Sequence, residues 1–356
     1  MMRRTLILGL VVAAAAVSAC KSAPVQQVAL DPLAQEALYD TTSSYYTDFS
    51  KYPKNIADLP IGIFDLNPTS AGTLTRTVML DCFDNITGSE RPDRINDFAG
   101  EHFIYYTALS DADSVYDANG RMDIHDAALK NTLFLVGDKC AQGNKERAKI
   151  VIAAGNITRA NGLNDIRAML TASGSGVKAI GVVEEGVKGL LDELAQMPML
   201  NYSIGLLADS LTIASGAYQQ TMRDIMRERG LKATIPVVGQ PLAAKDTLHG
   251  PSLANAFVSM IERHYSDGQP FPICAVISET YLDEQQIAVF QDIADNYRSK
   301  RINGDYPYRS VISDKLIFID PYECAAKECY RVLRRDNNLA LRIEDNQVLY
   351  YSDLPM

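Results

Sequence analysis

The chain has 356 residues and no tryptophan, and its 44 acidic against 34 basic residues give a formal net charge of −10 at pH 7. An acidic chain without a patch of basic and aromatic residues is not expected to bind nucleic acid. The length suits two domains of ordinary size.

The first 20 residues are typical of a secretion signal. Arg3 and Arg4 supply its positive start, residues 6–17 are apolar, and Ser-Ala-Cys ends it at Cys20. This ending resembles a bacterial lipobox; an ordinary signal peptide with an incidental cysteine is the alternative. We expect a signal peptide over 1–19, a lipid anchor on Cys20, and a soluble part held at a bacterial membrane in the cell envelope. Without residues 1–19 the formal charge becomes 32 − 44 = −12.

Residues 20–58 are polar and predict a tether, after which short apolar runs alternate with helical patterns. This alternation predicts an α/β fold with mostly parallel sheets. Residues 81–100 are polar and rich in turn residues. Strands are expected over 61–64, 103–106, 150–154, 177–183, 204–207, 273–277 and 316–319, and helices over 123–129, 187–197, 217–229, 252–264 and 283–298. Residues 339–343 and 348–351 flank a polar turn, which predicts a C-terminal hairpin.

The cysteines and histidines do not have the spacing of a metal site. Five cysteines remain besides Cys20, and the four histidines are scattered. An odd number of thiols leaves at least one unpaired in an oxidising compartment. No structural metal is predicted.

Four motifs in order resemble glutamate racemase, of the Asp/Glu racemase superfamily. Residues 61–65 read IGIFD, 151–156 VIAAGN, 212–219 TIASGAYQ and 316–321 LIFIDP. The family reads roughly IGVFDSGVGGLTV, VIACNTAS, G-x-x-T-x-x-SGAYQ and LILGCTHYP. The resemblance implies two facing three-layer α/β domains that close on a small carboxylate or amino-acid-like ligand without an organic cofactor. It divides the chain into two domains. The first consists of residues 59–165 and about 330–356, with an insertion near 81–100, and the second of residues 166–329. A homodimer is left open.

The two thiols of the family pattern are missing from this alignment. Racemisation without a cofactor needs one base on each face of the α-carbon, and a tuned thiolate can serve. Gly155 stands at the first thiol position and Asp320 at the second, with Pro321 and Tyr322 replacing the following Thr-His pair. A four-residue insertion would instead bring Cys324 to the second position.

Five residues are candidate site residues on this resemblance. Asp65 matches an aspartate that assists a thiol in the family, and it ends a strand where α/β proteins place ligands; an Asx-turn or helix cap is the structural alternative. Asp320 has the corresponding position on the last buried strand, or else opens a turn before proline. Asn156, Thr158 and Tyr322 are candidate ligand contacts.

Three functions follow. The favoured one is a divergent racemase-like lipoprotein that binds a small carboxylate or amino-acid-like ligand without two-thiol racemisation. The second is a hydrolase or lyase that uses Asp65 and Asp320 as an acid–base pair. The third is a retained glutamate or aspartate isomerase that uses Cys324. The enzyme hypotheses place their named side chains in one cleft.

Overall fold

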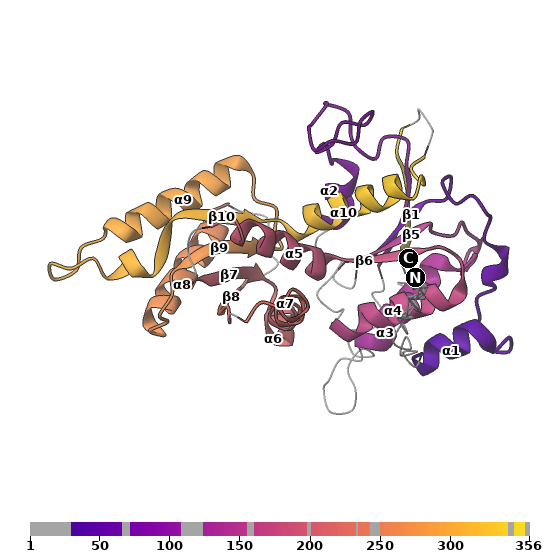
Figure 1. Ribbon diagram of the computed structural model, residues 1–356, viewed down its shortest axis with the longest axis horizontal. Coiled ribbons are helices and arrows are strands. Elements are labelled where there is room, and N and C mark those ends of the chain that lie inside the picture. The colour runs from indigo at the N-terminus through magenta and orange to yellow at the C-terminus, as the bar shows by residue number, and fades with distance from the viewer. Residues whose placement is uncertain are drawn as a thin grey trace, which may run out of the picture.

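The computed structural model describes residues 30–65, 72–107, 124–154, 160–197, 201–232, 234–242, 250–340 and 345–352. Within them the chain forms two lobes, each built on one parallel sheet, with helices α5 and α10 between the lobes (Figure 1). The predicted α/β class with mostly parallel sheets is confirmed. No helix among these residues is long and apolar enough to cross a membrane.

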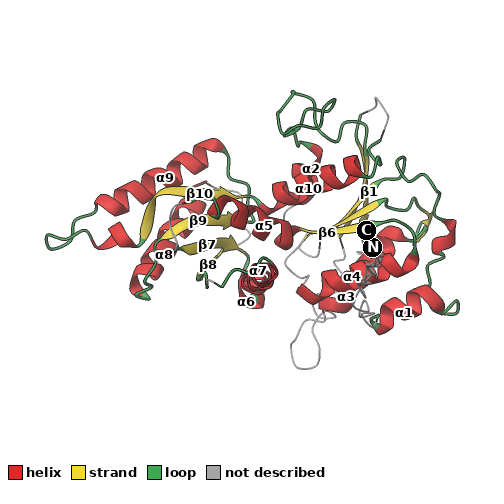
Figure 2. Ribbon diagram, viewed as in Figure 1, coloured by secondary structure: helices red, strands yellow, loops and turns green. Residues whose placement is uncertain are grey.

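The first lobe contains a five-stranded sheet in which all neighbouring strands are parallel (Figure 2). Its central strands are buried apolar runs, as expected for a sheet that is covered on both faces. In spatial order the strands are β11 (Gln347–Ser352), β2 (His102–Thr107), β1 (Ile61–Asp65), β5 (Ile150–Ala154) and β6 (Lys178–Gly181).

Helices cover both faces of this first sheet, which makes three layers. One face packs on α1 (Pro32–Tyr39), α3 (Ile124–Val136) and α4 (Ala160–Ser173). The other face packs on α2 (Gly72–Val78) and α10 (Pro321–Arg335). A small antiparallel pair, β3 (Lys139–Cys140) with β4 (Gly143–Asn144), follows α3.

The second lobe contains a four-stranded parallel sheet, again between two helical layers. In spatial order its strands are β10 (Ile312–Ile319), β9 (Ile273–Ser278), β7 (Ser203–Ala208) and β8 (Val237–Pro241). One face packs on α5 (Val182–Leu194) and α7 (Ala217–Glu228), the other on α8 (Gly250–Ser266) and α9 (Glu284–Ser299). The remaining short helices are α6 (Ser210–Ser215), η1 (Phe49–Lys51) and η3 (Pro307–Ser310).

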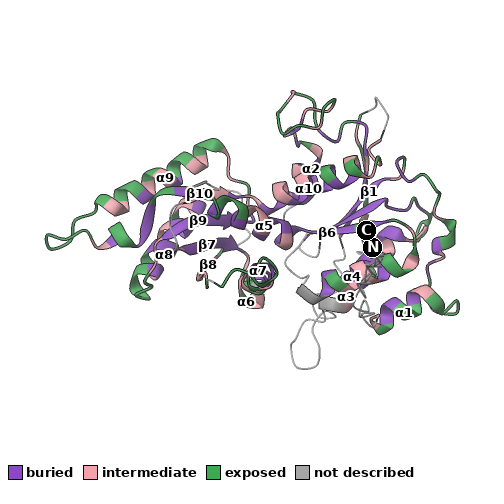
Figure 3. Ribbon diagram, viewed as in Figure 1, coloured by how far each residue is buried: buried purple, intermediate pink, exposed green. Residues whose placement is uncertain are grey.

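The expected tether over residues 20–58 is wrong for its second half. Leu33, Ala34 and Ala37 of α1 are buried against α3 and α4, and Phe49 joins the same core. The Tyr52 hydroxyl donates to the carbonyl of Ala148 at 3.0 Å. Residues 32–52 therefore belong to the first lobe, to whose core they contribute buried residues (buried residues are purple in Figure 3).

Three further expectations are corrected by strand pairing. β6 pairs with β5 and α10 packs on the first sheet, so the chain changes lobe near 181 and 320 rather than at 165 and 330. The expected strand over 177–183 ends at Gly181, because Val182 already begins α5. Instead of forming a hairpin, β11 pairs in parallel with β2; residues 341–344 lie outside the described part.

Candidate functional site

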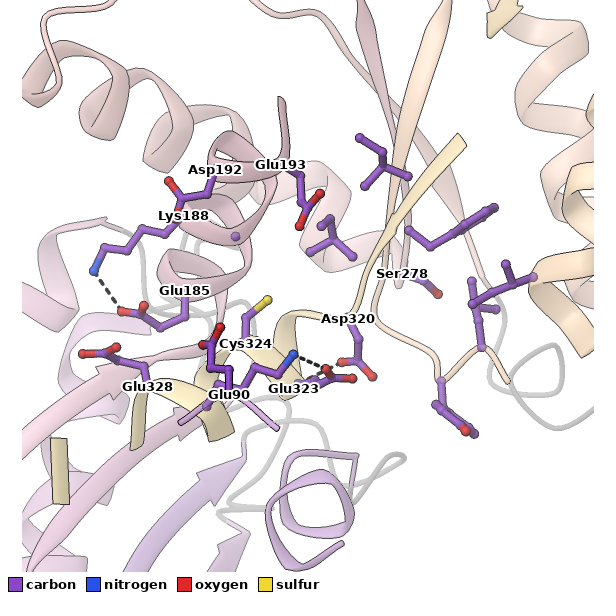
Figure 4. Close-up of a pocket in the computed structure, with 18 of the residues that line it drawn as sticks. Glu90, Glu185, Lys188, Asp192, Glu193, Ser278, Asp320, Glu323, Cys324 and Glu328 are labelled. Atoms are coloured by element: carbon purple, nitrogen blue, oxygen red, sulfur yellow. Dashed lines mark hydrogen bonds and ion pairs between the residues drawn. The ribbon is translucent and has the colours of Figure 1, made fainter. Parts of the chain in front are cut away.

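A pocket of about 730 Å³ opens between the lobes, beside the carboxyl ends of β9 and β10 (Figure 4). Ligands of parallel α/β folds bind at such strand ends. The lining carries charges of both signs, with seven acids against four bases. The acids are Glu90, Glu185, Asp192, Glu193, Asp320, Glu323 and Glu328, and the bases are Lys188, Arg229, Lys327 and Arg331.

Asp320 lies on this lining at the point where β10 passes into α10 (Figure 4). It is the N-cap of α10: its Oδ1 accepts the amides of Tyr322 at 2.9 Å and Glu323 at 3.1 Å. Burial raises the pKa of the Asp320 carboxyl above its ordinary value, against the opposing effects of the Glu323 amide and Arg76. Asp320 therefore caps a helix, where the sequence analysis offered a turn before proline as its structural alternative, and one carboxylate oxygen is left to face Arg76.

Arg76 extends from α2 of the first lobe to this carboxylate. Its Nε lies 2.9 Å from Asp320 Oδ2, and the two side chains are 16% and 19% exposed. The guanidinium carbon lies 3.3 Å from the ring centroid of Tyr281, which follows β9 in the second lobe. Arg76 thus joins both lobes beside the pocket, which Asp320 and Tyr281 line and Arg76 does not.

Asp65 ends β1 and is buried, with 2% of its surface exposed. The Tyr105 hydroxyl donates to its Oδ2 at 3.4 Å. Burial and then the Asp65 charge raise the pKa of Tyr105, which keeps this donor protonated. Asp65 is not among the residues that line the pocket, so this pocket does not bring Asp65 and Asp320 together.

Glu279 is a buried carboxylate that the sequence analysis missed. It directly follows β9, and its Oε1 accepts from the Tyr218 hydroxyl at 3.0 Å while Oε2 accepts from Thr212 at 3.2 Å. Burial and then Glu279 raise the pKa of Tyr218 well above its ordinary value. The TIASGAYQ motif thus positions an acid at the end of a central strand. An acid two residues after the apolar run 273–277 was the signal that could have found it.

Cys324 lines the pocket one turn into α10. Its Sγ packs against Gly189 of α5, where an added Cβ would lie 2.8 Å from the sulfur. Burial raises the pKa of the Cys324 thiol to about 12; Lys327 opposes the rise, and Glu323, Asp320 and Glu185 add to it. The thiol is therefore protonated near neutral pH, and a protonated thiol is not the base that racemisation needs.

The other expected site residues divide into buried and undescribed ones. Tyr322 is buried under α2, with its ring 3.2 Å from where a Cβ on Gly72 would lie. Asn156, Thr158 and Cys20 lie outside the described residues, as does Gly155. Among the described residues, no group of three or more histidine, cysteine or acidic side chains could hold a metal ion, and Cys82, Cys140, Cys274, Cys324 and Cys329 are free.

No protein-family model and no curated protein sequence matches the chain. Solved structures similar to it include glutamate racemase RacE1 from Bacillus anthracis, with 13% identity and a TM-score of 0.48 over 83% of this chain and 89% of that one. A Francisella tularensis glutamate racemase in complex with D-glutamate has 19% identity and a TM-score of 0.47 over 84% and 90%. An aspartate racemase homologue from Pyrococcus horikoshii has 12% identity and a TM-score of 0.38 over 77% and 99%.

These solved structures are glutamate racemases and an aspartate racemase homologue, and the motifs of this chain resemble the same superfamily. Fold similarity alone does not carry function from one protein to another. What the pocket can do has to follow from the side chains of this chain.

Proposed function

We propose that this protein binds a small amino-acid-like ligand in the interdomain pocket and does not racemise it with two thiols. The observation that carries the proposal is the character of the pocket lining. It combines acids with bases, whereas its one cysteine, Cys324, is a protonated thiol packed on a glycine. Such a lining suits a ligand that carries both an amine and a carboxylate.

The net charge of the lining favours a ligand that carries an amine. The lining contains three more acids than bases, and several of the acids lie on α5 and α10. The bases are engaged in ion pairs, such as Arg229 with Asp192 at 2.7 Å and Lys327 with Glu323 at 2.6 Å. Their partners are acids of the same lining and Asp320 pairs with Arg76, but acids still outnumber bases, so the lining favours a cationic group.

The two enzyme hypotheses have less support from the side chains. An isomerase based on Cys324 would need a thiolate, which burial among carboxylates disfavours. A hydrolase or lyase would need Asp65 and Asp320 on one substrate, and Asp320 already caps α10 and pairs with Arg76. Ligand binding without two-thiol chemistry requires neither a Cys324 thiolate nor an Asp320 that is free of its cap and its ion pair.

The test combines proton exchange with ligand binding. The purified protein is incubated in D₂O with each enantiomer of glutamate and aspartate, and with dipeptides that contain them, and the α-proton is followed by NMR. We expect the α-proton signal to persist, while at least one compound raises the melting temperature. Loss of the signal would overturn the non-racemising part, and the absence of any thermal shift would overturn ligand binding.

We also propose that the protein is a lipoprotein of the cell envelope, on the basis of Arg3, Arg4, the apolar residues 6–17 and Cys20. Cells fed radiolabelled palmitate should label the full chain and not its Cys20→Ser variant. Equal labelling of both proteins would contradict the anchor.

A further inference from the structure

We propose that the tip of the second lobe binds the surface of an anionic lipid bilayer. The tip comprises residues 297–310, which run from the end of α9 through a turn to η3. This segment projects at the left end of the molecule's longest axis (Figure 1). Residues 299–306 are all exposed (green in Figure 3). None of the tip residues lines the interdomain pocket, so the inference is independent of the proposed ligand.

The tip is positively charged although the whole chain is acidic. It contains four cations and one acid, whereas the chain has a formal net charge of −10. The cations are Arg298, Lys300, Arg301 and Arg309, and the acid is Asp305. The last three cations are exposed, and none of them forms an ion pair with a described residue. The end of α8 beside the tip adds Glu262, Arg263 and Asp267, which leaves the local charge positive. A positive end favours an anionic partner there.

Tyrosine rings surround the cations of the tip. Lys300 Nζ lies 4.8 Å from the ring centroid of Tyr297 and 5.3 Å from that of Tyr308. The guanidinium carbon of Arg309 lies 5.2 Å from the ring centroid of Tyr306. The sequence analysis expected no patch of basic and aromatic residues, and the tip corrects that expectation. Tyrosine, lysine and arginine have apolar stems and polar ends, which suit the interface between a bilayer and water.

The turn presents an apolar side chain at the end of this patch. Ile302 and Asp305 exchange two backbone hydrogen bonds, at 2.9 and 3.0 Å. Between them Asn303 and Gly304 have φ angles of 52° and 98°, as a two-residue turn with two positive φ angles requires. Ile302 is 39% exposed and Tyr306 44% exposed. Because the backbone of the turn is already ordered, little conformational freedom is lost when these side chains are bound.

A bilayer surface suits the tip better than a nucleic acid does. A bilayer can be contacted by a projecting end alone, and salt screens the acidic remainder of the chain beyond about 10 Å. A long polyanion that runs past the tip would meet that acidic remainder. The exposed tyrosine and isoleucine also gain from burial at the headgroup level, which a phosphate backbone does not provide. Anionic lipids attract each lysine or arginine near the surface, which tightens binding about fivefold per cation.

The test is cosedimentation of the unlipidated protein with vesicles. The chain from residue 20 to residue 356 with Cys20→Ser contains every described residue and cannot carry the proposed lipid. The vesicles are phosphatidylcholine alone or an equal mixture with phosphatidylglycerol. The tip variant combines Lys300→Gln, Arg301→Gln and Arg309→Gln. Its matched control replaces by glutamine three exposed cations of the first lobe without an ion pair to a described residue, namely Lys54, Arg91 and Lys139. Melting temperatures show whether each variant is folded.

We expect the protein to bind the anionic vesicles, to leave them as the salt concentration rises, and to bind phosphatidylcholine alone weakly. The tip variant should bind the anionic vesicles about 100-fold more weakly, and the first-lobe variant should bind like the unsubstituted protein. Ile302→Ser should weaken binding about threefold to tenfold, because it removes apolar burial.

Three outcomes would overturn the proposal. The first is that the folded protein does not bind the anionic vesicles. The second is an equal loss of binding in the tip variant and the first-lobe variant, which would make net charge rather than the tip responsible. The third is tighter binding to double-stranded DNA than to the anionic vesicles at the same phosphate concentration, which would make nucleic acid the partner.

Discussion

Cys324 and Lys149 are both buried titratable residues, and their surroundings give them opposite roles. Cys324 is enclosed by Gly189 and by carboxylates that disfavour its thiolate. Lys149 donates to Glu101 at 2.6 Å and to the carbonyls of Ala57 and Asn338 at 2.7 and 2.9 Å. Burial lowers the pKa of Lys149 and Glu101 opposes that effect. Cys324 therefore stays protonated and unreactive near neutral pH, while Lys149 links segments that are distant in sequence.

Alkylation of Cys324 by iodoacetamide should be slow near neutral pH and rise with pH. The reactive species is the thiolate, and a pKa of about 12 means that its fraction grows about tenfold per pH unit up to pH 11. At pH 8 the rate should be about a thousandfold below that of the unfolded chain, whose thiols have ordinary pKa values. Mass spectrometry of the peptide that contains Cys324 measures it. A plateau near pH 8 would indicate a tuned thiolate and support the isomerase.

Replacing Lys149 by methionine should lower the free energy of unfolding by about 3–5 kcal/mol. The variant leaves the Glu101 carboxylate buried without its cation, and breaking a buried pair from one side is costly. Urea unfolding measures the change. Lys178→Met is the matched control, since its pair with Asp336 is 47% and 26% exposed and should be worth less than about 1 kcal/mol. Equal effects of the two substitutions would show that burial does not set the strength of the Lys149 pair.

The contact between α5 and α10 is close because two glycines of α5 face α10. A Cβ added at Gly186 would lie 2.6 Å from Pro321 Cβ, and one at Gly189 would lie 2.8 Å from Cys324 Sγ. Neither distance is compatible with an added methyl group unless the helices separate. These two helices also carry Glu185 and Asp320 to the pocket.

Gly186→Ala should destabilise the protein by about 1–3 kcal/mol because it overpacks this contact. It should also weaken ligand binding, because separating the helices moves Asp320, the N-cap of α10, which lines the pocket. The control is Gly162→Ala in α4, where an added Cβ meets nothing closer than Ala128 at 4.0 Å. That control should be neutral or stabilising, since alanine favours helices. Thermal unfolding of both variants decides; a neutral Gly186→Ala would refute the close contact.

Most strands were predictable from the sequence because they are buried apolar runs with turn residues at their ends. β8 was not, because Gly239 and Pro241 interrupt a short segment that tolerates them at the edge of its sheet. The pairing of β11 with β2 could not be read from local pattern, since it joins residues far apart in sequence. The site was predictable in part: Asp320 lies on the pocket, whereas the partnership of Arg76 with Tyr281 depends on how the lobes meet.

At the scale of the whole molecule, the first lobe includes the segment that the sequence suggested was a tether. A chain that begins at residue 59 should be about 3–6 kcal/mol less stable than one that begins at residue 30. The shorter chain loses the burial of Leu33 and Phe49, at about 1.5–3 kcal/mol each. Denaturant unfolding of the two chains measures the difference. Equal stabilities would favour the original interpretation of this segment as a tether.

The chain leaves the first sheet after β6 and returns to it through α10, so the second lobe is one uninterrupted stretch within the first. β11 completes the first sheet at its edge beside β2, from which it is separated by more than half of the chain. Contacts between segments so distant in sequence form slowly, because their loop-closure entropy is lost before the contacts stabilise the fold. Because α10 and β11 are synthesised last, we expect the second lobe to be complete on the ribosome before the first lobe can close, although the chain begins with the first lobe.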